Sequence, residues 1–139
     1  MIYYAVIDTN VLVSAMLKAD STPGMVLKEA LGGSMIPLIC NEIIEEYRAV
    51  LSRPKFNFDT KAVQVLLDGL IARAITVDAG QVEDVLPDPK DAVFYEVVME
   101  HRKSNDAYLV TGNIKHFPAR PYVVTPREMV DIIQGEQGY

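Results

Sequence analysis

The sequence predicts a three-layer α/β/α sandwich with a central, mainly parallel sheet of about five strands. Short apolar runs rich in β-branched and aromatic residues alternate with longer segments of helical pattern along the 139 residues. The apolar runs are continuous, as expected for strands that are buried on both faces of a sheet. Acidic or amide side chains follow several of these runs, where a parallel sheet would bring them to one edge.

The first half of the chain contains two predicted strands and four predicted helices. Strands are expected over residues 2–7 and 35–40, and helices over residues 10–17, 22–32, 41–52 and 60–73. Thr22 is the expected N-cap of the second helix with Pro23 in its first turn, and Gly33 marks its end. Asn41 is expected to cap the third helix. Pro37 fits the second strand only at a sheet edge, or if the strand begins after it.

The second half repeats the alternation. Strands are expected over residues 74–77, 108–111 and 122–124, and helices over residues 88–102 and 126–134. Asp88 and Pro89 form a helix start, with Asp88 as the N-cap. We expect residues 1–134 to form a single domain and residues 135–139 to form a flexible tail.

Composition and charge narrow the function classes. The net charge is −6, so a protein that grips nucleic acid mainly through counterion release is disfavoured, and a nucleic-acid substrate would require a bound metal or a local basic patch. The single cysteine, Cys40, excludes an internal disulfide and is expected to be a buried thiol in a reducing compartment. No apolar run approaches membrane-spanning length and no leader is evident, which predicts a cytoplasmic protein.

Four positions are the candidate catalytic residues: Asp8, Glu46, Asp91 and Asn113. Each lies where a predicted strand ends or a predicted helix begins, so the topology should gather all four at the carboxyl edge of the sheet. Carboxylate oxygens at such an edge can hold a hard divalent cation, and Asp8, Glu46 and Asp91 are the predicted metal ligands. Taken alone, Asp8 could equally be a strand-end residue that caps the next helix.

Helical geometry separates Glu46 from its acidic neighbours. The apolar stripe of its helix is centred near Tyr47, and Glu46 lies about 100° from that centre, at the border of the stripe. Glu42 and Glu45 point about 140° and 160° away, which predicts a solvated face for both. Asp91 lies on the inward face of its own helix, where an unpaired carboxylate is costly unless a cation compensates it.

Neutral polar residues complete the predicted site. Thr111 and Asn113 follow a strand and can supply uncharged oxygens, although Gly-Asn after a strand is also ordinary turn chemistry. Asn10 and Thr111 are the predicted substrate-positioning residues. His101 is expected to pack on its helix and His116 to lie on an exposed loop, since neither belongs to a metal-ligand spacing.

These residues resemble the PIN-domain nucleases, particularly the toxin-like members. The resemblance is carried in order by the segments VIDTNVL, NEIIEEYRAVLSRPKF, PDPKD and DAYLVTGNIKHF. It implies a metal-dependent endoribonuclease that binds Mg²⁺ or Mn²⁺ through Asp8, Glu46 and Asp91. It also implies an RNA substrate, an antitoxin protein as partner and a homodimer. The family's fourth acidic place aligns with Asn113, an amide, which should weaken cation affinity.

Other protein families with an aspartate after the first strand require residues that this chain lacks. Haloacid-dehalogenase-like phosphatases need a second acid two residues after the first aspartate, where this chain has Asn10. Response-regulator receivers need paired acids after the first strand, which are missing here. The alternative from another class is a non-catalytic interaction module with the same fold, in which the metal site is degraded at Asn113.

Overall fold

The computed structural model describes residues 2–80 and 86–137. The strands are β1 (Tyr3–Ile7), β2 (Met35–Ile39), β3 (Ile75–Thr76), β4 (Tyr108–Val110) and β5 (Val123–Val124). The α-helices are α1 (Thr9–Leu17), α2 (Thr22–Gly32), α3 (Asn41–Leu51), α4 (Thr60–Arg73), α5 (Ala92–His101) and α6 (Pro126–Gln137). Three short 3₁₀ helices are η1 (Pro54–Phe56), η2 (Pro89–Asp91) and η3 (Ile114–His116).

The strands form one parallel sheet in the order β3-β2-β1-β4-β5. This confirms the predicted α/β sandwich with a parallel five-stranded sheet. The order reverses direction between β1 and β4, because the chain first moves from β1 towards β3 and then returns to the other side of β1. Ligands of open parallel sheets bind at such a switch point, beyond the carboxyl ends of the strands.

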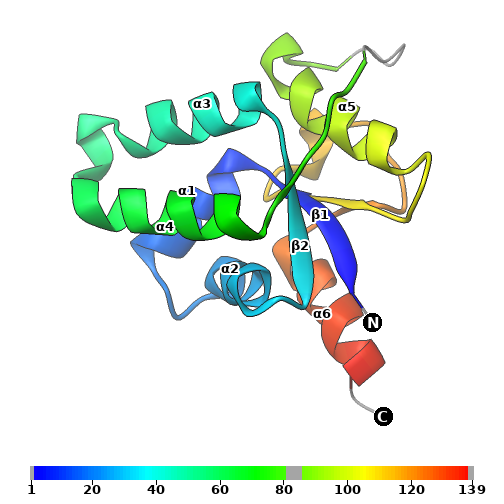
Figure 1. Cartoon of the computed structure of the whole chain (residues 1–139), viewed down its shortest axis with the longest axis horizontal. Coiled ribbons are helices and arrows are strands. Elements are labelled where there is room, and N and C mark those ends of the chain that lie inside the picture. Colours follow the sequence, from blue (N-terminus) through cyan, green and yellow to red (C-terminus); the bar gives the residue numbers. More distant parts are fainter. Residues whose placement is uncertain (1, 81–85, 138–139) are drawn as a thin grey trace.

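Helices cover both faces of this sheet. Helix α5 contacts β1, β2 and β4, whereas α2 and α4 contact β2, and α6 contacts β5. Figure 1 shows α5 on the opposite side of β1 and β2 from α2 and α4. Strands β1 and β2 are therefore covered on both sides, and Ala5 and Val6 of β1 and Leu38 of β2 are completely buried. Burial on both faces explains why the strand sequences are continuously apolar.

Pro37 lies in a strand that pairs on both sides, yet its environment is locally that of an edge. It stands opposite Ala5 of β1, while the pairing with β3 begins one residue later, at Leu38. Pro37 therefore has a strand partner on one side only, which is compatible with its missing backbone N–H.

Several helix boundaries differ from the predictions. The helix predicted over residues 88–102 is divided into η2 (Pro89–Asp91) and α5 (Ala92–His101). The N-cap of α2 is Ser21 rather than Thr22, because the Ser21 hydroxyl accepts a hydrogen bond from the backbone N–H of Gly24 at 3.2 Å. The N-cap of α3 is Cys40, and Asn41 is the first helical residue. Helix α6 continues to Gln137, three residues beyond its predicted end. The flexibility of the tail over residues 135–139 stays a prediction.

The described helices, in residues 2–80 and 86–137, include none with the length and apolar character that a membrane crossing requires.

Two glycines of α2 provide a matched test of the packing around this helix. A Cβ on Gly24 would lie 2.0 Å from the backbone oxygen of Ala19, whereas a Cβ on Gly32 would meet nothing within 4 Å. Gly24→Ala should therefore lower the free energy of unfolding by about 1–3 kcal/mol through overpacking. Gly32→Ala should leave it unchanged or raise it by up to about 1 kcal/mol, since alanine favours the helix. Urea unfolding of both variants measures the difference, and equal effects would contradict the close approach at Gly24.

Candidate active site

Asp8 lies directly after β1, at the switch point of the sheet. Its side chain is 7% exposed, although it is an ionisable group. The Thr111 hydroxyl, at the end of β4, donates a hydrogen bond to Asp8 Oδ2 at 2.8 Å, and the Asn10 amide donates to the same oxygen at 3.3 Å. The backbone N–H of Asp8 also donates to the carbonyl of Val110 at 2.9 Å. The carboxylate is thus held by both central strands.

The loop after β4 is joined to Asp8 through two polar side chains. The backbone N–H of Asn113 donates to the Thr111 hydroxyl at 3.0 Å, and that of Gly112 donates to Asn10 Oδ1 at 3.2 Å. Thr111 is completely buried. The structure therefore shows Asn10 and Thr111 holding Asp8 in place, and direct contact of either with a substrate stays a prediction.

Glu46 is the half-buried acidic residue of α3, whereas Glu42 and Glu45 are exposed, as the helical geometry predicts. The Thr9 hydroxyl, in the first turn of α1, donates a hydrogen bond to Glu46 Oε2. Thr9 is a site residue that the sequence analysis missed. Its only signal in the sequence is that it follows Asp8 directly.

Tyr47 ties the same helix to the end of β1. Its ring is 2% exposed and its hydroxyl donates a hydrogen bond to the carbonyl oxygen of Ile7, the residue before Asp8. Burial raises the pKa of the Tyr47 hydroxyl, with a further contribution from the negative charges of Asp8 and Glu46. Tyr47 therefore stays protonated as a donor and fixes Glu46 relative to Asp8.

Asp91 is the last residue of η2, just before α5. Asp88, the predicted N-cap, caps η2, since Asp88 Oδ1 accepts a hydrogen bond from the backbone N–H of Lys90 at 2.9 Å. Asp91 Oδ2 is shielded from solvent and accepts no hydrogen bond of normal geometry from the described residues. The nearest cationic or potentially cationic group is His116, whose Nδ1 lies 3.4 Å from this oxygen.

His116 corrects the sequence analysis. It was expected on an exposed loop without a role in the site; its side chain is 48% exposed, as expected, but it contacts Asp91. Asn113 contacts His116 as well, with its Nδ2 at 2.9 Å from His116 Nε2. The signal that could have identified His116 is its place three residues after Asn113, on one helical turn. His101, by contrast, packs against Tyr4 with ring centroids 4.7 Å apart, and burial lowers its pKa.

Electrostatic interactions link the three carboxylates. Burial raises the pKa of Asp8 to about 6, against the hydrogen bond from Thr111, and the charges of Asp91 and Glu46 raise it further. Burial also raises the pKa of Asp91, with contributions from Asp88 and Glu46, while His116 acts in the opposite direction. The three side chains that the sequence predicted as a cluster therefore lie close enough to repel one another.

The fit of this cluster to a divalent cation rests on two observations and is limited by a third. Asp8 is a buried carboxyl beside like charges, and Asp91 has a shielded oxygen that lacks a hydrogen bond; a cation would compensate both. However, across residues 2–80 and 86–137 no three acidic, histidine or cysteine side chains lie close enough together to hold an ion as they stand. The donor chemistry fits a cation, and binding would require the side chains to draw together.

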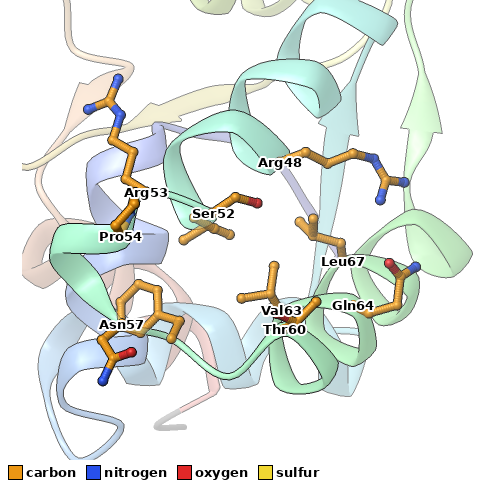
Figure 2. A pocket seen from close by; sticks show the side chains of 11 residues that line it. Arg48, Ser52, Arg53, Pro54, Asn57, Thr60, Val63, Gln64 and Leu67 are labelled. Atoms are coloured by element: carbon orange, nitrogen blue, oxygen red, sulfur yellow. The ribbon is translucent and has the colours of Figure 1, made fainter.

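Two cavities of about 270 Å³ differ in their relation to these carboxylates. One adjoins the site and is lined by Asn10, Ser14, Gly112 and Asn113, with two prolines from the starts of α2 and α6. The other lies between α3, η1 and α4, and none of the candidate catalytic residues lines it. Figure 2 shows that Arg48 and Arg53 extend from that second cavity in different directions rather than converging within it.

The comparison with protein families decides the assignment. The sequence matches the PIN-domain family over residues 4–115, a range that includes all four candidate catalytic residues.

The chain belongs to the PIN-domain family. No curated protein matches it. The PIN domain is a nuclease-like fold, and membership supports a hydrolase that acts on nucleic acids. The matched range ends at Lys115, one residue before His116, and it contains Asp8, Glu46, Asp91 and Asn113.

The raised pKa of Asp8 predicts how the stability of this PIN domain changes with pH. Between about pH 4 and pH 6 the folded protein retains the Asp8 proton while the unfolded chain releases it, so metal-free stability should fall as the pH rises. The full loss is about 3 kcal/mol and is reached above pH 6.

Asp8→Asn should remove this dependence, since the amide carries no charge and can still accept the hydrogen bond from Thr111. Urea unfolding at several pH values in the presence of a chelator measures the effect, and the difference between wild type and variant isolates Asp8 from other titrating groups. At pH 8 the variant should be the more stable protein. A wild-type minus variant difference that does not change with pH would contradict the buried, repelled carboxyl.

Proposed function

We propose that this PIN domain is an endoribonuclease that depends on Mg²⁺ or Mn²⁺. The observation that carries the proposal is the buried Asp8 carboxyl, whose pKa is raised to about 6 by burial and by two neighbouring acids. The ionised Asp8 carboxyl destabilises the metal-free protein. If its role were only structural, an asparagine could accept the same hydrogen bonds without this cost. Perturbed carboxyls at the ligand-binding edge of a parallel sheet are typical of functional sites.

Asp8, Glu46 and Asp91 are the residues that would hold the cation. When bound there, a divalent cation supplies Lewis-acid polarisation of a phosphate oxygen and lowers the pKa of a bound water. Thr111 and Asn10 fix Asp8, and Thr9 fixes Glu46. Glu46 is half-buried rather than enclosed, so it can orient or deprotonate the water that attacks the phosphate in line.

The approach of a polyanion to an acidic protein needs local compensation. Neutralisation of the carboxylates by a cation supplies part of it. Next to the Asn113 loop, a hollow of about 640 Å³ is lined by apolar side chains together with Lys115 and Arg120. Apolar surface for bases beside cationic groups for phosphates is a combination that suits a single-stranded nucleic acid. Arg53 and Lys55, near η1, are further candidates for backbone contacts.

Paired substitutions on α3 test the catalytic assignment. Glu46→Gln should lower metal-dependent RNA cleavage by at least about 100-fold, because it removes both a cation ligand and the group that orients the water. Glu45→Gln should leave cleavage unchanged, since Glu45 is exposed and is rotated about 100° from Glu46 about the helix axis, further from the apolar stripe. The measurement is the rate of cleavage of single-stranded RNA with Mn²⁺ and with a chelator, with single-stranded DNA as a parallel substrate.

Asp91→Asn and Asp8→Asn should abolish the same cleavage, and Mn²⁺ should raise the melting temperature of the wild type but not of Asp8→Asn. Cleavage that persists in the chelator, or that survives Asp91→Asn, would refute the proposal.

A role as the toxin of a toxin–antitoxin pair follows from the resemblance of the motifs to toxin-like PIN proteins. It entails cleavage of cellular RNA, an antitoxin protein that blocks the site, and a homodimer. Expression of the wild type from an inducible promoter should arrest growth, and Asp91→Asn should relieve the arrest at equal protein level. A short neighbouring reading frame should encode the protein that restores growth on coexpression. Equal growth with wild type and variant would contradict the toxin role.

One observation favours a second candidate function, a non-catalytic interaction module. Asn113 stands where the family's fourth acid is expected, and its amide contacts His116 in the described structure. For this alternative, clean protein would show no cleavage, and Mn²⁺ would not shift the melting temperature of the wild type.

A further inference from the structure

The three carboxylates of the site differ in the hydrogen bonds that they accept from neutral side chains. Asp8 accepts from Thr111 at 2.8 Å, and Glu46 accepts from Thr9. Asp91 differs, because its shielded Oδ2 accepts no hydrogen bond of normal geometry from the described residues. His116 Nδ1, a potential donor, lies 3.4 Å from this oxygen. His116 therefore lies where it could donate to Asp91 as the two threonines donate to Asp8 and Glu46.

The orientation of the Asn113 amide against His116 favours one tautomer of the neutral ring. Asn113 Nδ2 lies 2.9 Å from His116 Nε2. An amide nitrogen can only donate, so Nε2 must accept, and the proton of the neutral ring is then on Nδ1, which faces Asp91. The opposite orientation of the amide would place the proton on Nε2 and direct the lone pair of Nδ1 at a carboxylate. The observed orientation avoids that repulsion.

We propose that His116 is a positioning residue for Asp91, and that Asn113 sets the tautomer in which His116 Nδ1–H faces the carboxylate. The inference rests on the proposed function in one respect, namely that Asp91 is a cation ligand. It assigns Asn113 a role that an aspartate could not fill, because a carboxylate cannot donate to Nε2. An aspartate at this position would accept from Nε2–H and favour the other tautomer.

The expected action of His116 is to hold the Asp91 carboxylate in the orientation in which it would ligate the cation. Ligating carboxylates are commonly hydrogen-bonded by outer residues, and loss of such a partner typically weakens metal affinity 10–100-fold. At 3.4 Å the contact is longer than a formed hydrogen bond, and contacts of this kind often shorten when the ligand binds. Because His116 is about half exposed, its ring can make this small adjustment.

The first test is spectroscopic and needs no metal. The chain has two histidines, so the His116 ring signals can be assigned by comparison with His116→Ala. Long-range ¹⁵N–¹H spectra of metal-free wild type should show protonated Nδ1 and unprotonated Nε2 for His116. Asn113→Asp should shift the tautomer population of the neutral ring towards protonated Nε2. A wild-type ring with protonated Nε2 alone would overturn the inference.

The second test measures Mn²⁺ affinity by titration in three variants of His116. The side-chain nitrogen of asparagine lies near the position of Nδ1, whereas that of glutamine lies nearer to Nε2. His116→Ala and His116→Gln should weaken Mn²⁺ binding by about 10-fold or more, while His116→Asn should retain most of the affinity. Equal Mn²⁺ affinity in the wild type and all three variants would overturn the positioning role. Tighter Mn²⁺ binding by His116→Gln than by His116→Asn would overturn it as well.

The two tests separate this inference from the proposed function. If wild type and Asp8→Asn show the same lack of Mn²⁺ binding, the proposed metal site fails, and the assigned role of His116 towards a cation ligand fails with it. The spectra then still decide whether Asn113 sets the ring tautomer. If wild type binds Mn²⁺ and cleaves RNA but the His116 variants match it, the nuclease stands and the positioning role is refuted.

Discussion

The burial of a carboxyl group between the two central strands is the constraint on which the site depends. Asp8 is held there by the Thr111 hydroxyl at 2.8 Å and lies within the electrostatic reach of Asp91 and Glu46. The strand order of the sheet reverses between β1 and β4, and the carboxyl ends of these two strands therefore lie side by side at this point. The cost of keeping like charges there is therefore built into the topology and must be offset by hydrogen bonds or by a cation.

Much of the fold could be predicted because its sequence patterns are local. Helix α4 has the predicted bounds, Thr60–Arg73, since a helical pattern fills them and Asp59 supplies a cap. The N-caps of α2 and α3 were each misplaced by one residue, because neighbouring Ser and Thr, or Cys and Asn, satisfy the same local rule. The approach of Asp8, Glu46 and Asp91 followed from topology, which requires only the order of the elements.

The parts of the site that were missed depend on tertiary contacts between side chains. Thr9 and Glu46 lie on different helices, and the sequence does not show that the hydroxyl of one reaches the carboxylate of the other. His116 carries no motif of its own, and its contact with Asp91 arises from the packing of η3 beside η2. Asn113 was predicted to lie beside the cluster, but only the structure shows that its amide contacts His116.

The amide at position 113 changes the balance between fold stability and cation affinity. A fourth carboxylate would add negative charge to a site where burial already raises the pKa of Asp8 and Asp91, and so would destabilise the metal-free protein further. A cation that binds only the folded protein would relieve this repulsion. The free energy released by that relief would appear as tighter cation binding. On the proposed function, Asn113 would lower both the repulsion and the cation affinity. A site with three carboxylates, two of which accept hydrogen bonds from threonine hydroxyls, would have a lower cation affinity and a more stable metal-free fold.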